Sequence, residues 1–162
     1  MHIIGVISDT HGLLRDEALE VLQGSVLILH AGDVGPPEIL ERLRDIAPVR
    51  AVRGNTDRGA FGETLPIRDV VPLGPAGGAA ESPLAYMVHD IEDLDVDPAA
   101  AGFRVVVYGH SHRPALQERN GVLYFNPGAA GHRRFHLPVT VGQLLVDAHG
   151  AITPRVIDLE AS

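Results

Sequence analysis

Short clusters of acids, amides and histidines recur along the chain, and each interrupts an apolar run. They are Asp9-Thr10-His11, Gly32-Asp33, Gly54-Asn55, His89 and Gly109-His110-Ser111-His112. Their side chains offer only nitrogen and oxygen donors, which suit borderline divalent cations. The donor set is large enough to hold two such ions side by side, and paired metals are widely used to cleave phosphate esters. The clusters therefore predict a two-metal site with phosphate-ester chemistry.

The first half of the chain alternates between strands and helices. Short apolar runs rich in β-branched residues predict buried strands at residues 2–7, 26–29 and 49–52. Apolar residues at helical spacing predict helices at 13–23 and 37–46. This βαβαβ order indicates a mainly parallel sheet with helices on its faces.

The second half predicts mostly strands. We expect them at residues 65–73, 84–88, 103–108, 115–119, 122–125, 139–147 and 151–159. The stretch 90–101 is acidic and rich in alanine, which predicts a helix broken by Pro98. Turns are predicted at 74–78, at Asn120-Gly121 and at His149-Gly150.

The clusters fall where the predicted strands end. Asp9, Asp33 and Asn55 follow the first three strands, and His89 and His110 follow later ones. In open α/β sheets, ligands bind at the carboxyl ends of the strands. We therefore expect residues far apart in the sequence to meet at one edge.

Composition restricts the function. The net charge of −8 argues against long duplex nucleic acid or an anionic membrane as the main partner, because both favour a basic surface. The chain has neither cysteine nor lysine, which excludes thiolate sites, disulfides and Schiff-base chemistry. The opening apolar run is too short for a signal peptide or a membrane span, so we expect a cytoplasmic protein.

The combined motifs resemble one known family. The pattern Asp9-x-His11, Gly32-Asp33, Gly54-Asn55-x-Asp57, His89 and Gly109-His110-x-His112 resembles the calcineurin-like metallophosphoesterase superfamily. Asn126-Pro127-Gly128 is similar to a further motif of its small single-domain prokaryotic phosphodiesterase branch. The resemblance implies an α/β fold, a four-layer α/β/β/α sandwich of two mixed sheets flanked by helices, as one domain over residues 1–162.

The resemblance also implies roles for the donors. Asp9, His11 and His112 would bind one metal ion, while Asn55, His89 and His110 would bind the other. Asp33 would bridge both, and Asp33, Asn55 and His89 are the candidate catalytic residues. A hydroxide shared by the two ions would attack phosphorus. We expect two divalent metal ions. Manganese is the first choice for their identity, and iron, zinc, cobalt or nickel are alternatives.

Two positions depart from the family pattern. Thr56 stands where many members have a histidine that protonates the leaving group, and a threonine hydroxyl is a poor proton donor. General-acid assistance is worth about 10²–10⁴-fold, so we expect a preference for acidic leaving groups. His89 is followed by Asp90, where the family usually has glycine and a second histidine, which leaves the role of that neighbour open.

The sequence leaves more than one role open for the other polar residues beside the clusters. Thr56, Arg58 and Arg113 are candidates for binding substrate, and solvated surface arginine is the competing interpretation for the last two. Asp57 would either brace the Asn55 loop, pair with an arginine or act in catalysis. We expect Asn126 to shape a turn beneath the site and treat residues such as His30 as ordinary.

The sequence thus predicts a metal-dependent phosphodiesterase acting on a small phosphate ester. Two alternatives stay open: a phosphomonoesterase acting on nucleotides or phosphoprotein, and a non-catalytic protein-interaction scaffold of the same fold. No membrane partner is expected. The substrate, the native metal and the oligomeric state, a homo-oligomer included, are not determined by these residues.

Overall fold

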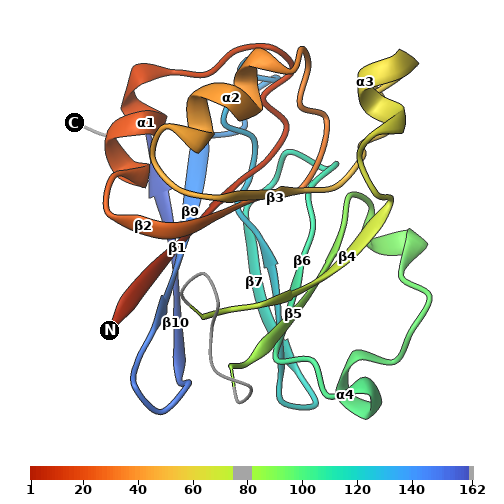
Figure 1. Cartoon of the computed structure of the whole chain (residues 1–162), viewed down its shortest axis with the longest axis vertical. Helices are drawn as coiled ribbons and strands as arrows, with labels where there is room; N and C mark the ends of the chain where they lie inside the picture. The colour runs from red at the N-terminus through yellow and green to blue at the C-terminus, as the bar shows by residue number, and fades with distance from the viewer. Residues whose placement is uncertain (75–81, 161–162) are drawn as a thin grey trace.

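The computed structural model describes residues 1–74 and 82–160, and its core is a pair of five-stranded sheets packed face to face (Figure 1). Sheet A has the strand order β10-β9-β1-β2-β3, and sheet B has the order β4-β5-β6-β8-β7. No helix in these described ranges is long and apolar enough to cross a membrane.

Sheet A is mixed. Its strands are β1 (His2–Ile7), β2 (Ser25–His30), β3 (Val49–Ala51), β9 (Thr140–Val146) and β10 (Ile152–Asp158). β1, β2 and β3 run parallel, whereas β9 is antiparallel to both β1 and β10. The parallel strands read as continuous apolar runs because layers cover both of their faces.

Sheet B is mixed in the same way. Its strands are β4 (Arg68–Pro72), β5 (Leu84–Val88), β6 (Val105–Val107), β7 (Ala115–Arg119) and β8 (Val122–Asn126). β5, β6 and β8 are parallel in the middle, and β4 and β7 are antiparallel at the two edges. The carboxyl ends of β5 and β6 therefore lie at one edge of the sheet.

The main core fills the space between the sheets. Ile4 and Leu29 of sheet A and Met87 and Phe125 of sheet B are all fully buried there. The sheets approach closely at Gly142 in β9, because a Cβ at this position would lie 2.5 Å from the ring of Phe125. The missing side chain lets the ring of one sheet pack directly on the backbone of the other.

Helices form the two outer layers. α1 (Asp16–Leu22) and α2 (Glu38–Arg44) bury apolar residues against the outer face of sheet A. Within the described ranges, the outer face of sheet B carries only the 3₁₀ helix η1 (Ile91–Asp93), α4 (Pro98–Ala101) and the chain around them. The expected four-layer sandwich is confirmed, with a thin layer over sheet B.

Several predicted boundaries were wrong. The helix predicted at 90–101 is η1 and α4 instead, because Asp90 and Asp97 each cap a new short helix. The short helix α3 (Gly59–Glu63) was not predicted, since it has too few residues to show a period. The turn at Asn120-Gly121 is confirmed, while most of the turn predicted at 74–78 lies outside the described residues.

Candidate metal centre

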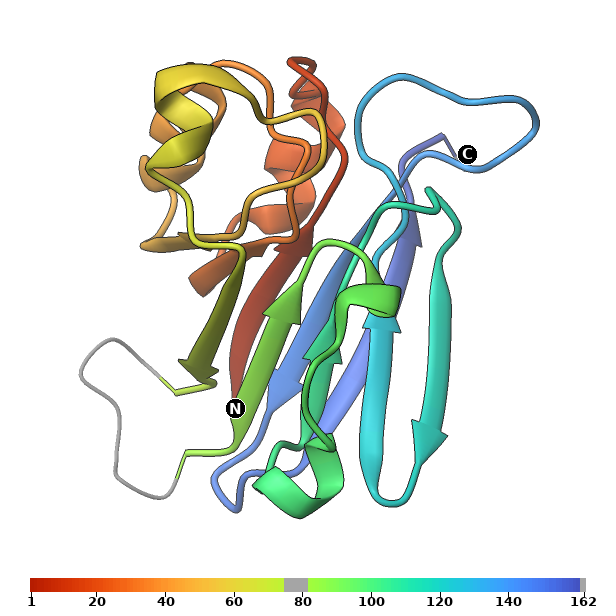
Figure 2. The ribbon, with the colours of Figure 1, turned by 90° about the vertical axis from the view of Figure 1, so that its right-hand side faces the viewer.

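The predicted donors meet where the carboxyl ends of both sheets come together. Asp9, Asp33 and Asn55 stand on the loops after β1, β2 and β3 of sheet A. His89 follows β5, and the His110–His112 loop follows β6, both of sheet B. Figure 2 shows these loops at the same end of the molecule as α1, α2 and α3. The cluster therefore spans the seam between the sheets.

One group of donors gathers around Asp9. Its Oδ1 lies 3.4 Å from Nε2 of His112 and 3.8 Å from Nε2 of His11. Potential ligand atoms of all three residues lie within 4.8 Å of one another. Separations of this size between ligand atoms are those expected when each atom lies about 2.1 Å from one shared metal ion.

A second group gathers around Asp33 and His89. The Nε2 atom of His89 lies 3.2 Å from Oδ2 of Asp33 and 3.0 Å from Oδ1 of Asn55. That same Asn55 oxygen lies 3.2 Å from Nδ1 of His110. His11 approaches Asp33 from the other side, with its Nε2 atom 3.5 Å from Oδ2. Oδ2 of Asp33 thus lies between the two groups.

Each carboxylate has one oxygen anchored and the other directed at imidazoles. Oδ2 of Asp9 accepts hydrogen bonds from the hydroxyl of Ser8 and the backbone N–H of His110. Oδ1 of Asp33 accepts from the backbone N–H of Thr56. Among the described residues, Oδ1 of Asp9 and Nε2 of His11 are buried without a hydrogen-bond partner.

Unpartnered buried atoms of this kind are rare, because burying a polar atom without a partner costs about 1–3 kcal/mol. Divalent cations coordinated by these nitrogen and oxygen atoms would satisfy them. The donor set therefore fits the metals that the sequence predicts.

Hydrogen bonds and neighbouring charges keep the two carboxyl groups ionised despite their burial. Burial alone raises the pKa of Asp9, but hydrogen bonding to His112 and the charge of His89 outweigh it, so this pKa lies below its ordinary value. Burial likewise raises the pKa of Asp33, and hydrogen bonds from His89 and Thr56 outweigh it and lower this pKa. Two adjacent anions are ready to receive cations.

The donor residues adopt an unusual backbone conformation. Five of them have a positive φ, between 45° and 70°: Asp9, His11, Asp33, His110 and His112. Residues with a Cβ avoid this left-handed region, and Asp, Asn and His tolerate it best. Strain of this kind gathers at functional sites and persists only where surrounding contacts hold it in place.

Asp57 is the main contact that holds the Asp33 and Asn55 loops together. Its buried carboxylate accepts hydrogen bonds of 2.9 Å from the backbone N–H groups of Asp33, Val34 and Gly54. Of the three roles that the sequence left open, bracing is confirmed. The brace extends further than predicted, because it joins the loop of Asp33 to the loop of Asn55.

His30 plays a similar part that the sequence did not reveal. The ring is fully buried, and its Nδ1 atom accepts a hydrogen bond from the N–H of Gly32. Its proton therefore lies on Nε2 and is donated to the hydroxyl of Thr10, which in turn donates to the carbonyl of Val34. The ring ties the first loop to the second. In the sequence, only the position of His30 just before Gly32-Asp33 could have indicated this role.

Asn126 supports the loop of sheet B. Its side-chain amide donates to the carbonyl of Gly109 and the hydroxyl of Ser111, and its Oδ1 accepts from the N–H of Gly128. The turn predicted for Asn126-Pro127-Gly128 beneath the site is therefore confirmed. Gly109 packs so tightly that a Cβ there would lie 2.1 Å from Oγ of Ser8.

The remaining candidates are exposed and follow donor residues along the chain. The side chains of Thr56, Arg58 and Arg113 are exposed, and the backbone N–H of Thr56 donates to Oδ1 of Asp33. Asp90 caps η1 and has its Oδ2 atom 3.6 Å from Nε2 of His110. Asp90 therefore brings a third carboxylate, besides those of Asp9 and Asp33, to the edge of the cluster.

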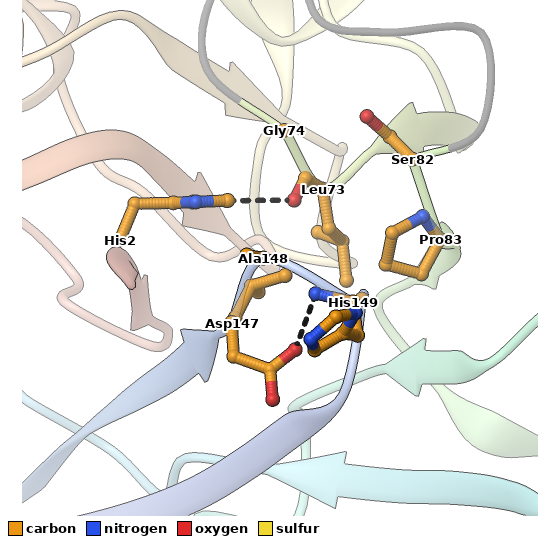
Figure 3. A pocket seen from close by; sticks show the side chains of 10 residues that line it. His2, Leu73, Gly74, Ser82, Pro83, Asp147, Ala148 and His149 are labelled. Carbon is orange, nitrogen blue, oxygen red and sulfur yellow. Dashed lines mark hydrogen bonds between the residues drawn. The ribbon is translucent and has the colours of Figure 1, made fainter.

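A separate hollow of about 450 Å³ lies at the opposite end of the sandwich (Figure 3). Two of its polar side chains are hydrogen-bonded within the chain. His2 hydrogen-bonds the carbonyl of Leu73, and Asp147 accepts from the N–H groups of His149 and Ala151. Among the described residues, none of the buried atoms without a hydrogen-bond partner belongs to this hollow.

Comparisons with known proteins agree with this geometry. The family profile of the calcineurin-like phosphoesterase superfamily domain matches residues 1–149. The chain therefore belongs to the calcineurin-like phosphoesterase superfamily and is by class a metal-dependent phosphoric ester hydrolase.

Individual relatives cover most of the chain. A probable metallophosphoesterase of Methanothermobacter thermautotrophicus is 34% identical over 134 residues, which are 78% of this chain and 76% of that protein. Phosphodiesterase YfcE of Escherichia coli K12 is 29% identical over 165 residues, covering 85% and 84%. The structure of Vacuolar Protein Sorting 29 from Cryptosporidium parvum matches with a TM-score of 0.73 at 21% identity, covering 97% of each chain. At that identity the likeness shows the fold alone.

Replacing Asp57 should loosen both loops. Asp57→Asn exchanges one acceptor oxygen for an amide and leaves at least one buried N–H unpaired, so we expect a loss of about 3 kcal/mol in the free energy of unfolding. Urea denaturation of the metal-free protein measures this loss. Asp147→Asn is the control, because Asp147 also accepts two backbone N–H groups but in an open turn. Equal losses in the two variants would contradict the bracing role.

His30 should make stability depend on pH. Burial lowers the pKa of His30 to about 4, whereas the unfolded chain binds the proton near pH 6.5. Neutral His30 therefore contributes up to about 3 kcal/mol to the free energy of unfolding. This contribution is fully present above pH 6.5 and is lost as the pH falls toward 4. Urea unfolding should show that His30→Gln is less stable than the wild type at pH 8. Its free energy of unfolding should also fall less than that of the wild type as the pH is lowered. His149→Gln should follow the wild type, and parallel curves for the wild type and His30→Gln would refute the assignment.

Proposed function

We propose that this protein is a phosphodiesterase with a binuclear metal centre. Asp9, His11 and His112 would hold one ion, and Asn55, His89 and His110 the other, with Asp33 between them. Bound divalent cations would supply a nucleophile at neutral pH and neutralise charge on the phosphoryl oxygens. Manganese is the first candidate, since oxygen and nitrogen donors without thiolate suit it.

One observation supports this proposal above the others, namely the position of Asp33. Its Oδ2 atom lies 3.5 Å from Nε2 of His11 and 3.2 Å from Nε2 of His89, while its Oδ1 atom is anchored by Thr56. A carboxylate oxygen that faces one imidazole of each group is placed to serve two ions. Asp33, Asn55 and His89 are accordingly the proposed catalytic residues.

The chain's own residues would orient the ester. Thr56, Arg58 and Arg113 are exposed and close in sequence to donor residues, and their hydroxyl and guanidinium groups would suit anionic phosphoryl oxygens. Burial lowers the pKa of His11, so its imidazole is neutral and ready to coordinate at pH 7. With no histidine at position 56, the leaving oxygen departs without that proton donor, which favours diesters with acidic leaving groups.

Two alternatives are separated by experiment. The fold likeness to Vacuolar Protein Sorting 29 keeps a protein-interaction scaffold under consideration, and the complete donor set argues for catalysis instead. A phosphomonoesterase would share every donor named above. A turnover screen of diesters and monoesters, with each metal added to stripped protein, distinguishes all three.

One domain over residues 1–162, a cytoplasmic location and the oligomeric state stay predictions.

The metal stoichiometry tests the centre directly. Wild-type protein reconstituted with excess Mn²⁺ should contain about two ions per chain by elemental analysis. Asp33→Asn should bind fewer ions and lose at least a hundred-fold in kcat/KM, because it removes the charge shared by both sites. Asp45→Asn, on the surface after α2, should behave as the wild type. A wild-type protein that binds only one ion per chain, together with a fully active Asp33→Asn variant, would contradict the binuclear proposal.

Thr56 predicts how the rate depends on the leaving group. Across a series of aryl phosphodiesters, kcat/KM should fall steeply as the leaving phenol becomes less acidic. Thr56→His should flatten this dependence by supplying a proton, whereas Thr56→Ala should cost only about 1 kcal/mol, the scale of a neutral hydrogen bond. A linear free-energy plot for the three proteins measures the effect. A flat wild-type line, with chemistry rate-limiting, would mean that another residue gives the proton.

A further inference from the structure

Asp90 lies beside His110, one of the proposed metal ligands, and the sequence left its role open. The Oδ2 atom of Asp90 lies 3.6 Å from Nε2 of His110. The loops that carry these two residues are joined directly before them, because the N–H of Gly109 donates to the carbonyl of His89 at 2.9 Å. A backbone hydrogen bond therefore holds Asp90 and His110 next to each other.

The carboxylate of Asp90 is held in a fixed frame. Its Oδ1 atom accepts a hydrogen bond of 3.0 Å from the N–H of Glu92 and caps η1. η1 is tied to β4, because the guanidinium of Arg68 donates to the carbonyl of Asp93. Asp90 thus has one oxygen anchored and the other directed at an imidazole, as both carboxylates of the cluster do.

His89 shows how a contact on one ring nitrogen selects the nitrogen that faces the donors. Its Nδ1 atom lies 2.7 Å from the carbonyl of Ala31. A carbonyl can only accept, so Nδ1 carries the proton of the neutral ring and Nε2 is left with its lone pair. This Nε2 atom is the one that lies 3.2 Å from Oδ2 of Asp33 and 3.0 Å from Oδ1 of Asn55.

His110 has the same division with its two nitrogens exchanged. Its Nδ1 atom lies 3.2 Å from Oδ1 of Asn55, the oxygen that also faces His89. Its Nε2 atom faces Asp90 instead, and within residues 1–74 and 82–160 no other carboxylate pairs with this ring. The separation is slightly longer than a hydrogen bond, but the side chains of His110 and Asp90 are 45% and 29% exposed, so a small rotation of either closes it.

We infer that Asp90 is a positioning residue for His110: it accepts a hydrogen bond from Nε2–H and thereby presents Nδ1 to the ion shared with Asn55 and His89. A metal-bound imidazole commonly donates its other N–H to a carboxylate, which fixes the ring and makes it a stronger ligand. This inference rests on the proposed binuclear centre and assigns Asp90 to one of its two ions.

Asp90→Asn separates this role from helix capping. Asparagine caps helices as well as aspartate does, so its oxygen should keep the bond from Glu92. The amide NH₂ group then replaces Oδ2 and donates toward Nε2 of His110, which favours the proton on Nδ1 and blocks that nitrogen. Asp97→Asn is the matched control, because Asp97 caps α4 in the same way and no imidazole of the described residues pairs with it.

Titration calorimetry with Mn²⁺ measures the two binding steps without turnover. Asp90→Asn should weaken one step about ten-fold or more and leave the other unchanged, whereas Asp97→Asn should match the wild type in both. Urea denaturation of the metal-free proteins should give equal stability for all three, since both caps are kept. Wild-type affinities in Asp90→Asn, or an equal loss in Asp97→Asn, would overturn the inference.

Nitrogen NMR of the zinc-loaded protein observes the ring of His110 directly. Long-range proton–nitrogen spectra distinguish the protonated nitrogen from the metal-bound one, and His110→Gln identifies the signals of this ring. The wild type should carry the proton on Nε2 and zinc on Nδ1. Zinc on Nε2, or a His110 that binds no zinc, would overturn the inference. If the wild type binds only one ion, the binuclear proposal fails by itself, and this spectrum still decides the role of Asp90.

Discussion

The left-handed backbone at the strand ends is the constraint on which the site depends. Each such residue costs roughly 1–2 kcal/mol in isolation, and five donor residues adopt the conformation together. Hydrogen bonds, most of them between different loops, offset this strain. Asp57 binds the amides of two loops, His30 joins the first loop to the second, and Asn126 holds the loop of sheet B. The donors are thus positioned before any ligand arrives.

Much of this arrangement is readable in the sequence, because two strong regularities coincide. Apolar runs mark the parallel strands, and donor residues follow directly where those runs end. The rule that strand ends share an edge then places Asp9, Asp33 and His89 together, as the structure finds them. The hairpin at Asn120-Gly121 was equally clear, since both positions need the left-handed conformation that Asn and Gly tolerate.

What the sequence could not show are contacts that depend on how separate loops align. Asp57 looked like part of the Asn55 motif, yet two of its strongest bonds go to Asp33 and Val34, 24 and 23 residues away. His30 carried no sign of its role, because a buried histidine and a surface one look alike in a single sequence. Helix α3 was too short to leave a periodic signal.

The seam between the sheets has a kinetic consequence. The carboxylates of Asp9 and Asp33 belong to sheet A, and the imidazoles of His89, His110 and His112 belong to sheet B. An ion coordinated by both sets cross-links the two sheets at their carboxyl ends, opposite the hollow at the other end of the sandwich. Separation of the sheets at that end would first have to break those metal–ligand bonds, which would slow the opening of the sandwich.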